Sequence, residues 1–189
     1  LSGCHNFAAG QNALFNNWGG SSNTAIGRDA LKANTTGCHN TAIGHALLYQ
    51  NTTGNHNTAI GQYALHSSTT GSHNIGIGNV ALYNNTTGWY NTALGQYALN
   101  GNTTGCFNTA IGILAGEHND DGKCNSFYGY TAGRYLANGS TELTSPGNST
   151  YLGACTRGYA VGDCNVTVVG HCACACGDNT VSIGNGDVT

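Results

Sequence analysis

The chain has 189 residues, of which 7% are charged and 30 are Gly. Its five Lys and Arg residues are too few to replace the counterions along a nucleic-acid backbone, so we expect no nucleic-acid partner. No apolar run approaches the ~20 residues that cross a bilayer, so we expect no membrane insertion. Because 39% of the residues are hydrophobic, the low charge does not indicate disorder, and the chain should pack around a core.

An internal repeat begins near the start of the chain. Its consensus, N-T-A-I-G-x-x-A-L-x-x-N-T-T-G-x-x, is seventeen positions long, and its first Asn recurs at this spacing from Asn6 to Asn125. Such a unit is too short for two helices and their turns. It suits one turn of a β-solenoid, in which short strands are joined at corners that Gly permits. The sequence therefore predicts an all-β fold, a β-roll or β-helix of 17-residue turns.

Stacking the repeats places like residues in columns up the coil. Stacked Asn side chains can form hydrogen-bonded ladders, and Ala adds small filler at two positions of each repeat. At ~4.8 Å between strands, about eleven turns give a rod near 50 Å long. We expect two columns of large aliphatic residues to form the core: Ile26, Ile43, Ile60, Ile77, Leu94 and Ile111 in one, and Leu14, Leu31, Leu48, Leu65, Leu82 and Leu99 in the other.

The repeat divides the chain into three parts. Residues 1–142 form the 17-residue repeat, residues 143–147 contain the single Pro and read as a loop extruded from one corner, and residues 148–189 form Cys-rich C-terminal turns. In this register the first-Asn column continues at Asn148 and Asn165 and, after a shorter step of fourteen positions, at Asn179. Because the chain begins in mid-repeat with no capping turn, we expect it to be a segment of a longer chain.

The N-T-A-I-G and N-T-T-G units resemble repeats of bacteriophage tail fibres and related bacterial surface proteins, which often end in an endosialidase-type intramolecular chaperone. Residues 179–189 are similar to the stretch that often precedes that chaperone, and the turn between Gly170 and Gly184 resembles the head repeats of trimeric autotransporter adhesins. The resemblance implies a parallel homotrimer of β-coils, extracellular or on a virion surface, that attaches to a host-surface glycan or receptor. The nine Cys residues depart from that family.

Further apolar columns in the sequence also indicate that several chains associate. On a single coil they would form an exposed apolar stripe, which usually marks an interface, so we expect self-association. The residues in these columns are Tyr63, Val80 and Tyr97, and then Phe15, Tyr49 and Tyr83.

The cysteines are odd in number, so at least one is free, pairs between chains or binds something. Cys155 and Cys172 stand one repeat length apart, at the same position of adjacent turns. Their expected Cα separation of about 5 Å suits a disulfide, and we predict one. Cys172, Cys174 and Cys176 alternate and would share one face of a strand. That face could be a small buried apolar cluster or, around a trimer axis, a thiolate metal site; the sequence leaves both open.

The residue before each first Asn is often aromatic. His39, His56 and His73 precede three successive Asn residues, and Tyr90 and Phe107 continue the column. Three interpretations are open: a metal site, a strip of rings that stacks on sugars, or a purely structural stack. As candidates for receptor binding we take His39, His56, His73, Trp89, Tyr90 and Phe107.

The acidic segment from Glu117 to Asp121 could hold Ca²⁺ or be a solvated loop, and its spacing fits no EF-hand. The acids and bases are too few and too scattered to name a catalytic pair, so we expect no enzyme, no cofactor and no resident metal ligand. The leading hypothesis is a structural and adhesive fibre segment.

Two other functions remain open. A self-polymerising extracellular filament would differ from the fibre only in end-to-end assembly. Ice binding is favoured by a regular column of Thr residues. It is opposed by the T-T pattern, because two adjacent Thr residues point to opposite faces and each face then carries only one Thr column. That column consists of Thr35, Thr52, Thr69, Thr86 and Thr103.

Overall fold

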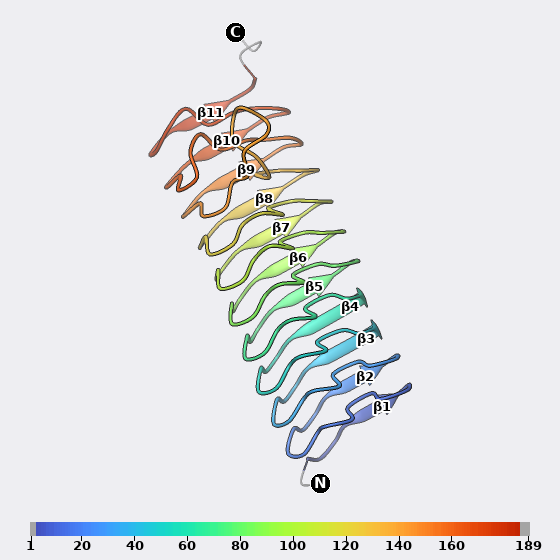
Figure 1. Ribbon diagram of the computed structural model, residues 1–189. Coiled ribbons are helices and arrows are strands. Elements are labelled where there is room, and N and C mark those ends of the chain that lie inside the picture. The colour runs from blue at the N-terminus through green and yellow to red at the C-terminus, as the bar shows by residue number, and fades with distance from the viewer. Residues whose placement is uncertain (1–2, 186–189) are drawn as a thin grey trace.

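The protein is a rod of stacked coils with one strand in each turn (Figure 1). The computed structural model describes residues 3–185, so the last four residues of the stretch 179–189 lie outside the described part. Eleven strands pair in chain order in one parallel sheet. They are β1 (Phe7–Ala9), β2 (Thr24–Ile26), β3 (Thr41–His45), β4 (Thr58–Gln62), β5 (Ile75–Ile77), β6 (Thr92–Leu94), β7 (Thr109–Ile111), β8 (Ser126–Tyr128), β9 (Thr150–Leu152), β10 (Thr167–Val169) and β11 (Val181–Ile183).

The register of the sheet confirms the parallel β-solenoid. Ile43 in β3 pairs with Ile60 in β4, and Ala42 pairs with Ala59. Each repeat unit therefore makes one turn and sets like residues side by side. A parallel sheet built this way needs no crossover helix, because the rest of each turn returns the chain to the start of the next strand.

The corners depend on backbone conformations with positive φ. The Gly that ends the T-A-I-G stretch of β3, Gly44, has a φ of 136°, and a Cβ atom there would lie 1.8 Å from the carbonyl oxygen of Gly61 in the next turn. Only Gly fits this close approach. In the turns up to Leu99, three further positions are left-handed without being Gly, as at His39, Tyr63 and Leu65, with φ of 59°, 56° and 54°.

Two buried Asn columns tie the turns together. The side-chain oxygen of Asn57 accepts a hydrogen bond from the backbone N–H of Asn74 at 2.9 Å, and its amide donates to the carbonyl of Gly71 at 2.8 Å. In the second column, Asn34 donates to the side-chain oxygen of Asn17 at 2.7 Å. These ladders confirm the predicted role of Asn, since they pair backbone groups at corners that the sheet does not reach.

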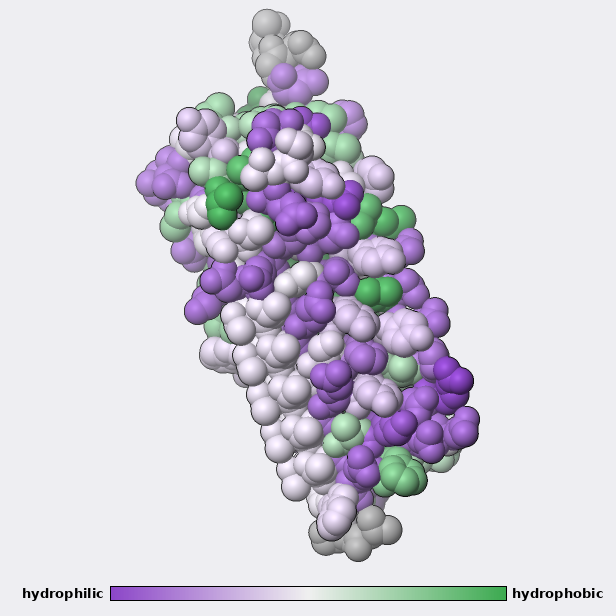
Figure 2. Space-filling model, viewed as in Figure 1, coloured by the Kyte–Doolittle hydropathy of each residue, from purple (hydrophilic) through white to green (hydrophobic). Residues whose placement is uncertain are grey.

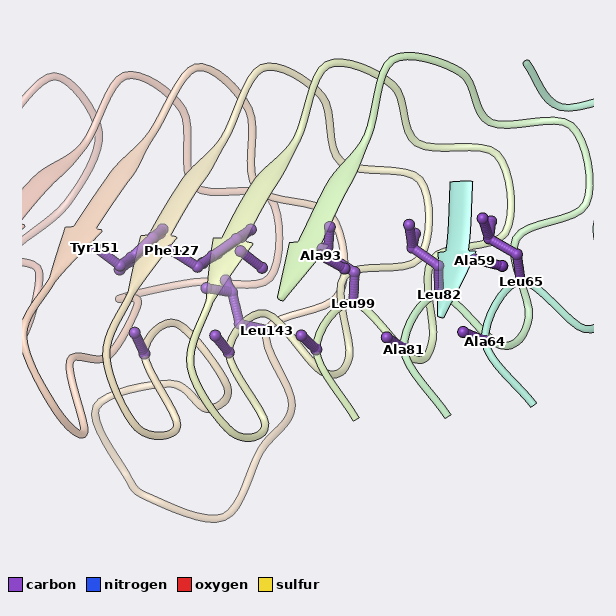
Figure 3. Packing of buried hydrophobic residues seen from close by; sticks show 14 of the residues in the cluster. Ala59, Ala64, Leu65, Ala81, Leu82, Ala93, Leu99, Phe127, Leu143 and Tyr151 are labelled. Carbon is purple, nitrogen blue, oxygen red and sulfur yellow. The ribbon is translucent and has the colours of Figure 1, made fainter. Parts of the chain in front are cut away.

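The core consists mainly of Leu and Ala (Figure 3). In β2 the side chain of Ala25 is fully buried, whereas Ile26 is 36% exposed. Successive residues of a strand point to opposite faces, so Thr and Ile both face outward and Ala faces inward. The prediction that the Ile column belongs to the core is therefore wrong. The Leu column is correct, with Leu31, Leu48, Leu65, Leu82 and Leu99 all fully buried, while Leu14 in the first turn is half-buried against the core.

An excursion from the coil precedes β9. Ser126 pairs with Thr150, and this turn advances by 24 positions where the turn before it advances by 17. The extra residues form a short hairpin whose neck is an antiparallel bridge between Tyr135 and Glu142. The insertion therefore lies ahead of residues 143–147, which are part of the coil and not the loop predicted for them. Leu143 is fully buried, and the carbonyl of Pro146 accepts the amide of Asn125, as Gly carbonyls do in earlier turns.

The excursion also shifts the register by one residue from the predicted one. Ser149 stands in the first-Asn column, because its N–H donates to the side-chain oxygen of Asn125 at 3.0 Å. Asn148, Asn165 and Asn179 instead take the left-handed corner position before it, with φ between 52° and 58°. The last turn is shorter than the others, as predicted, since the amide of Asn165 donates to the side-chain oxygen of Asn179, 14 positions farther on.

Candidate functional site

Five aromatic rings stack in an unbroken line along one corner of the rod. Ring centroids of neighbours lie 4.6 to 5.4 Å apart, and neighbouring planes deviate by at most 13°. The left-handed corner before the first Asn positions each ring at the same point of its turn, and the repeat brings the rings into register. We call this line the ring ladder; it consists of His39, His56, His73, Tyr90 and Phe107.

Trp89 widens the ladder at its upper end. Its ring lies 5.3 Å from Tyr90 and 4.8 Å from Phe107, tilted by 55° and 60°. These three side chains are 45% to 48% exposed. The structure thus brings all six predicted binding candidates together on one corner, and about half of the aromatic surface at its upper end meets solvent.

The ladder presents flat apolar surfaces together with imidazole nitrogens. Burial lowers the pKa of His56, and the charges of His39 and His73 lower it further, so its neutral form is favoured. A neutral imidazole offers one hydrogen-bond donor and one acceptor. Rings that stack face to face do not converge their nitrogens on one point. Within residues 3–185 no ladder His belongs to a group of three or more potential metal ligands.

A second, shorter ladder lies on another column. The rings of Tyr49, His66 and Tyr83 stack at 5.0 and 4.9 Å, with Tyr63 packed edge-on against His66. The ammonium of Lys32 lies 5.2 Å from the centre of the Tyr49 ring, a cation–π distance. The apolar pattern of the sequence predicts Tyr49 and Tyr83 in this column but not His66, because His is not counted among the apolar residues.

The outward face of the sheet carries two columns of side chains, one of Thr and one of large aliphatic residues. Thr and Ile point outward on either side of the buried Ala, as Thr58 and Ile60 do around Ala59. Several large aliphatic side chains of this face are 36% to 47% exposed: Ile26, Ile43, Ile60, Leu94, Ile111 and Leu152. On the side of the rod drawn in Figure 2, pale and weakly polar residues run up the lower turns, and strongly hydrophilic ones form patches.

The Thr column considered for ice binding has a structural role. The hydroxyl of Thr35 donates to the carbonyl of Thr52 at 2.9 Å, and Thr52 donates likewise to Thr69 at 3.1 Å. These side chains are half-buried, and their hydroxyls are engaged by the next turn. They reinforce a corner of the coil instead of forming a free surface.

The acids considered for Ca²⁺ have other partners. The carboxylate of Glu117 pairs with Arg134 and lies 3.4 Å from His118. The carboxylate of Asp120 accepts the hydroxyl of Thr103. They do not converge on one point, so the segment is better described as a surface loop pinned to the neck of the excursion.

Cys155 and Cys172 lie next to each other in successive turns, as predicted. The structure describes both as free thiols, so the predicted disulfide is not confirmed. Their sulfur atoms and one ring nitrogen of His171 all lie within 4.8 Å of one another. Farther along, Cys172, Cys174 and Cys176 line one side of an open hollow of about 380 Å³, opposite β11.

None of residues 3–185 forms a helix long and apolar enough to cross a membrane. Comparisons of the chain with protein-family models, with curated proteins and with solved structures found no match. The function must therefore be inferred from the geometry of this molecule.

Proposed function

We propose that the chain is a structural and adhesive fibre segment, a stiff extracellular rod that displays a binding surface for a carbohydrate or receptor on a host cell. The observation that carries this proposal is the ring ladder. Its rings repeat at one per turn, they are held by the backbone, and its upper end is about half exposed. Aromatic faces provide rigid apolar contact area at low entropic cost, and the imidazole and phenol groups at their edges can bond to hydroxyls.

The exposed aliphatic column supports association of such rods, which we propose to be trimeric. Ile43 and Ile60 are 39% and 37% exposed in the single chain, next to each other on the outward face of the sheet. A contiguous apolar stripe of this kind usually marks an interface, and the long uncharged stretch of the sequence imposes no repulsion between copies. In light scattering we expect a mass of about three times 19.3 kDa.

A substitution on that face tests the interface. Ile60→Lys places a charge in the apolar column and should convert the trimer to monomers. Thr53→Lys adds the same charge at an exposed position on a different corner and should leave the mass unchanged. A monomeric native chain would contradict the trimer, and masses that grow with concentration would indicate a filament instead.

Recognition is tested on the ladder itself. The double variant Trp89→Ala and Tyr90→Ala should lower adsorption to host cells, or binding to a glycan array, by about tenfold or more. Tyr159→Ala removes a 59% exposed ring away from the ladder and serves as the matched control. If the double variant assembles correctly and its adsorption is unchanged, the ladder is not a binding surface.

Ice binding is a second candidate, and the outer face of the sheet favours it. Thr41 and Thr58 align on that face with Ile43 and Ile60, so a Thr-x-Ile pattern repeats on a flat surface at the strand spacing. This face differs from the corner Thr column, whose hydroxyls are engaged by the next turn, but it too carries one Thr column and not two. Thermal hysteresis that disappears in the Thr58→Tyr variant would support ice binding; a trimer without hysteresis would support the fibre.

A further inference from the structure

The C-terminal turns concentrate sulfur at one place. Five of the nine cysteines lie between Cys155 and Cys176. Cys155 and Cys172 occupy the same left-handed corner of successive turns, with φ of 58° and 55°. His171 directly precedes Cys172, so the step from one turn to the next sets two thiols and an imidazole side by side.

The backbone holds this corner in place. The N–H of Cys155 donates to the carbonyl of Tyr130 at 2.8 Å, and the N–H of Cys172 donates to the carbonyl of Ala154 at 2.9 Å. Both cysteines are half-buried, and His171 is exposed. The site therefore has a fixed floor of two sulfur atoms and one side that is open to solvent.

The distances are close to those of a tetrahedral metal site. The sulfur of Cys172 lies 3.7 Å from Nε2 of His171, and all three potential ligand atoms lie within 4.8 Å of one another. With Zn–S bonds of about 2.3 Å and Zn–N bonds of about 2.0 Å, a tetrahedral site needs ligand separations of about 3.5 to 3.8 Å. Side-chain rotations that shorten a separation by at most about 1.3 Å would suffice.

We propose that Cys155, His171 and Cys172 form a binding site for Zn²⁺, with the fourth position open to water or to an external ligand. Thiolate and imidazole are the ligands that zinc prefers. Three protein ligands and one open position distinguish this arrangement from a closed structural site. The proposal does not depend on the fibre function.

Without a bound cation, the electrostatics of the corner disfavour thiolates. Burial raises the pKa of the Cys172 thiol, and the sulfurs of Cys155 and Cys174 raise it further, while the guanidinium of Arg157 opposes them. Without a cation, neighbouring thiols resist becoming neighbouring thiolates. A divalent ion removes that repulsion and deprotonates the thiols that it binds. Zinc therefore competes with protons for these ligands, as at other thiolate sites.

The test uses the reduced full chain and Co²⁺ as a spectroscopic probe for zinc. We expect one equivalent of Co²⁺ to produce a sulfur-to-cobalt charge-transfer band and the visible bands of tetrahedral cobalt, both abolished by one equivalent of Zn²⁺. Cys155→Ser and Cys172→Ser should each weaken binding by about 100-fold or more, and His171→Ala by about tenfold or more. Cys124→Ser removes an exposed thiol elsewhere on the rod and should change nothing.

Three results would overturn the site. They are a wild-type chain without the charge-transfer band, a Cys155→Ser variant that keeps the band with unchanged affinity, and a Cys155–Cys172 disulfide in chain isolated without reductant. Should the Cys variants not fold, His171→Ala decides, because that side chain is exposed and its removal leaves the coil intact. Unchanged cobalt affinity in this variant refutes the three-ligand site.

Discussion

The regular turns from β2 to β6 and the irregular turns from β7 to β11 follow the same coil with different side chains inside it. In a regular turn the centre of the strand is Ala59 and the inner corner is Leu65, both fully buried. In the irregular region Phe127 takes the place of the Ala and Gly133 that of the Leu. A Cβ atom on Gly133 would lie 2.3 Å from the Phe127 ring. Side-chain volume has moved from one column to the other.

The exchange continues in the next turn, where Tyr151 stacks on Phe127 at 5.4 Å in the row that Leu residues fill lower down (Figure 3). The first-Asn column changes as well, to Ser149 and then to Val166, whose N–H donates to the Ser149 hydroxyl at 3.1 Å. The comparison shows that corners and strand pairing define the fold. The filling of the core can vary as long as its total volume is kept.

The largest expected effect on stability comes from variants that disturb this exchange of side-chain volume between the two columns. Phe127→Ala leaves a cavity and should lower the free energy of unfolding by about 3–5 kcal/mol. Gly133→Leu alone should be at least as harmful, because its side chain meets the Phe127 ring. The double variant restores the Ala and Leu of a regular turn and should recover at least about 1 kcal/mol relative to the sum of the single variants, measured by denaturant unfolding. Purely additive costs would show that the two columns do not share volume.

The next effect concerns what the two regions have in common, the Gly corners. Gly44→Ala places a Cβ against the next turn at a φ of 136° and should cost about 3 kcal/mol or more. Gly162→Ala is the matched control, since an added Cβ there meets nothing within 4 Å. Equal melting temperatures for the two variants would contradict the close stacking of Gly on Gly.

A smaller loss of stability is expected from changes in the buried Asn column of the regular turns, which other residues replace in the irregular turns. Asn74→Val removes the acceptor for the N–H of Asn91 at 3.0 Å and the donor to the carbonyl of Gly88 at 2.8 Å. Two backbone groups are left unpaired in a buried position, and the cost should be about 2–4 kcal/mol. The same change at the exposed Asn16 should stay within about 0.5 kcal/mol. If both variants melt alike, the Asn ladder does not hold the turns together.

The smallest effect is a pH dependence that belongs to the regular turns. The pKa of His56 and that of His66 are both lowered, first by burial. The folded chain therefore binds fewer protons than the unfolded chain below pH 6.5, the ordinary pKa of His. The contribution of these two His residues to the free energy of unfolding is present above that pH. It is lost as the pH falls through their lowered pKa values in the folded chain. The melting temperature should fall from pH 8 to pH 5, and His56→Tyr should flatten the curve; an unchanged slope would exclude His56 as its source.

The sequence was sufficient to predict the coil and the ring ladder because both follow from one spacing. Residues one repeat apart must be neighbours if each repeat is one turn, so His39, His56 and His73 had to stack. The Ile column was placed wrongly because hydrophobicity does not tell which face of a strand is inside. A thin coil leaves room at that point for the methyl group of Ala25, and Ile26 is turned outward.

The register predicted for the turns after the excursion is wrong for another reason. Asn suits two adjacent positions, the hydrogen-bonding column and the left-handed corner before it, because it tolerates positive φ. Asn148 takes the corner, with φ of 52°, and Ser149 takes the column. The approach of His171 to the two thiols could not be read from the repeat either, since it occurs once and depends on side-chain rotation.

The stacking of successive repeats in register is tested most directly by methyl contacts in solution. In a chain with labelled Ile methyl groups, we predict nuclear Overhauser cross-peaks between Ile43 and Ile60, which pair in β3 and β4. Peaks between Ile43 and the Ile of the second turn above, Ile77, should be absent. Contacts of Ile43 with Ile26 and Ile60, its partners one repeat away on either side, would confirm one repeat per turn; a missing Ile43–Ile60 contact, or an Ile43–Ile77 contact, would contradict it.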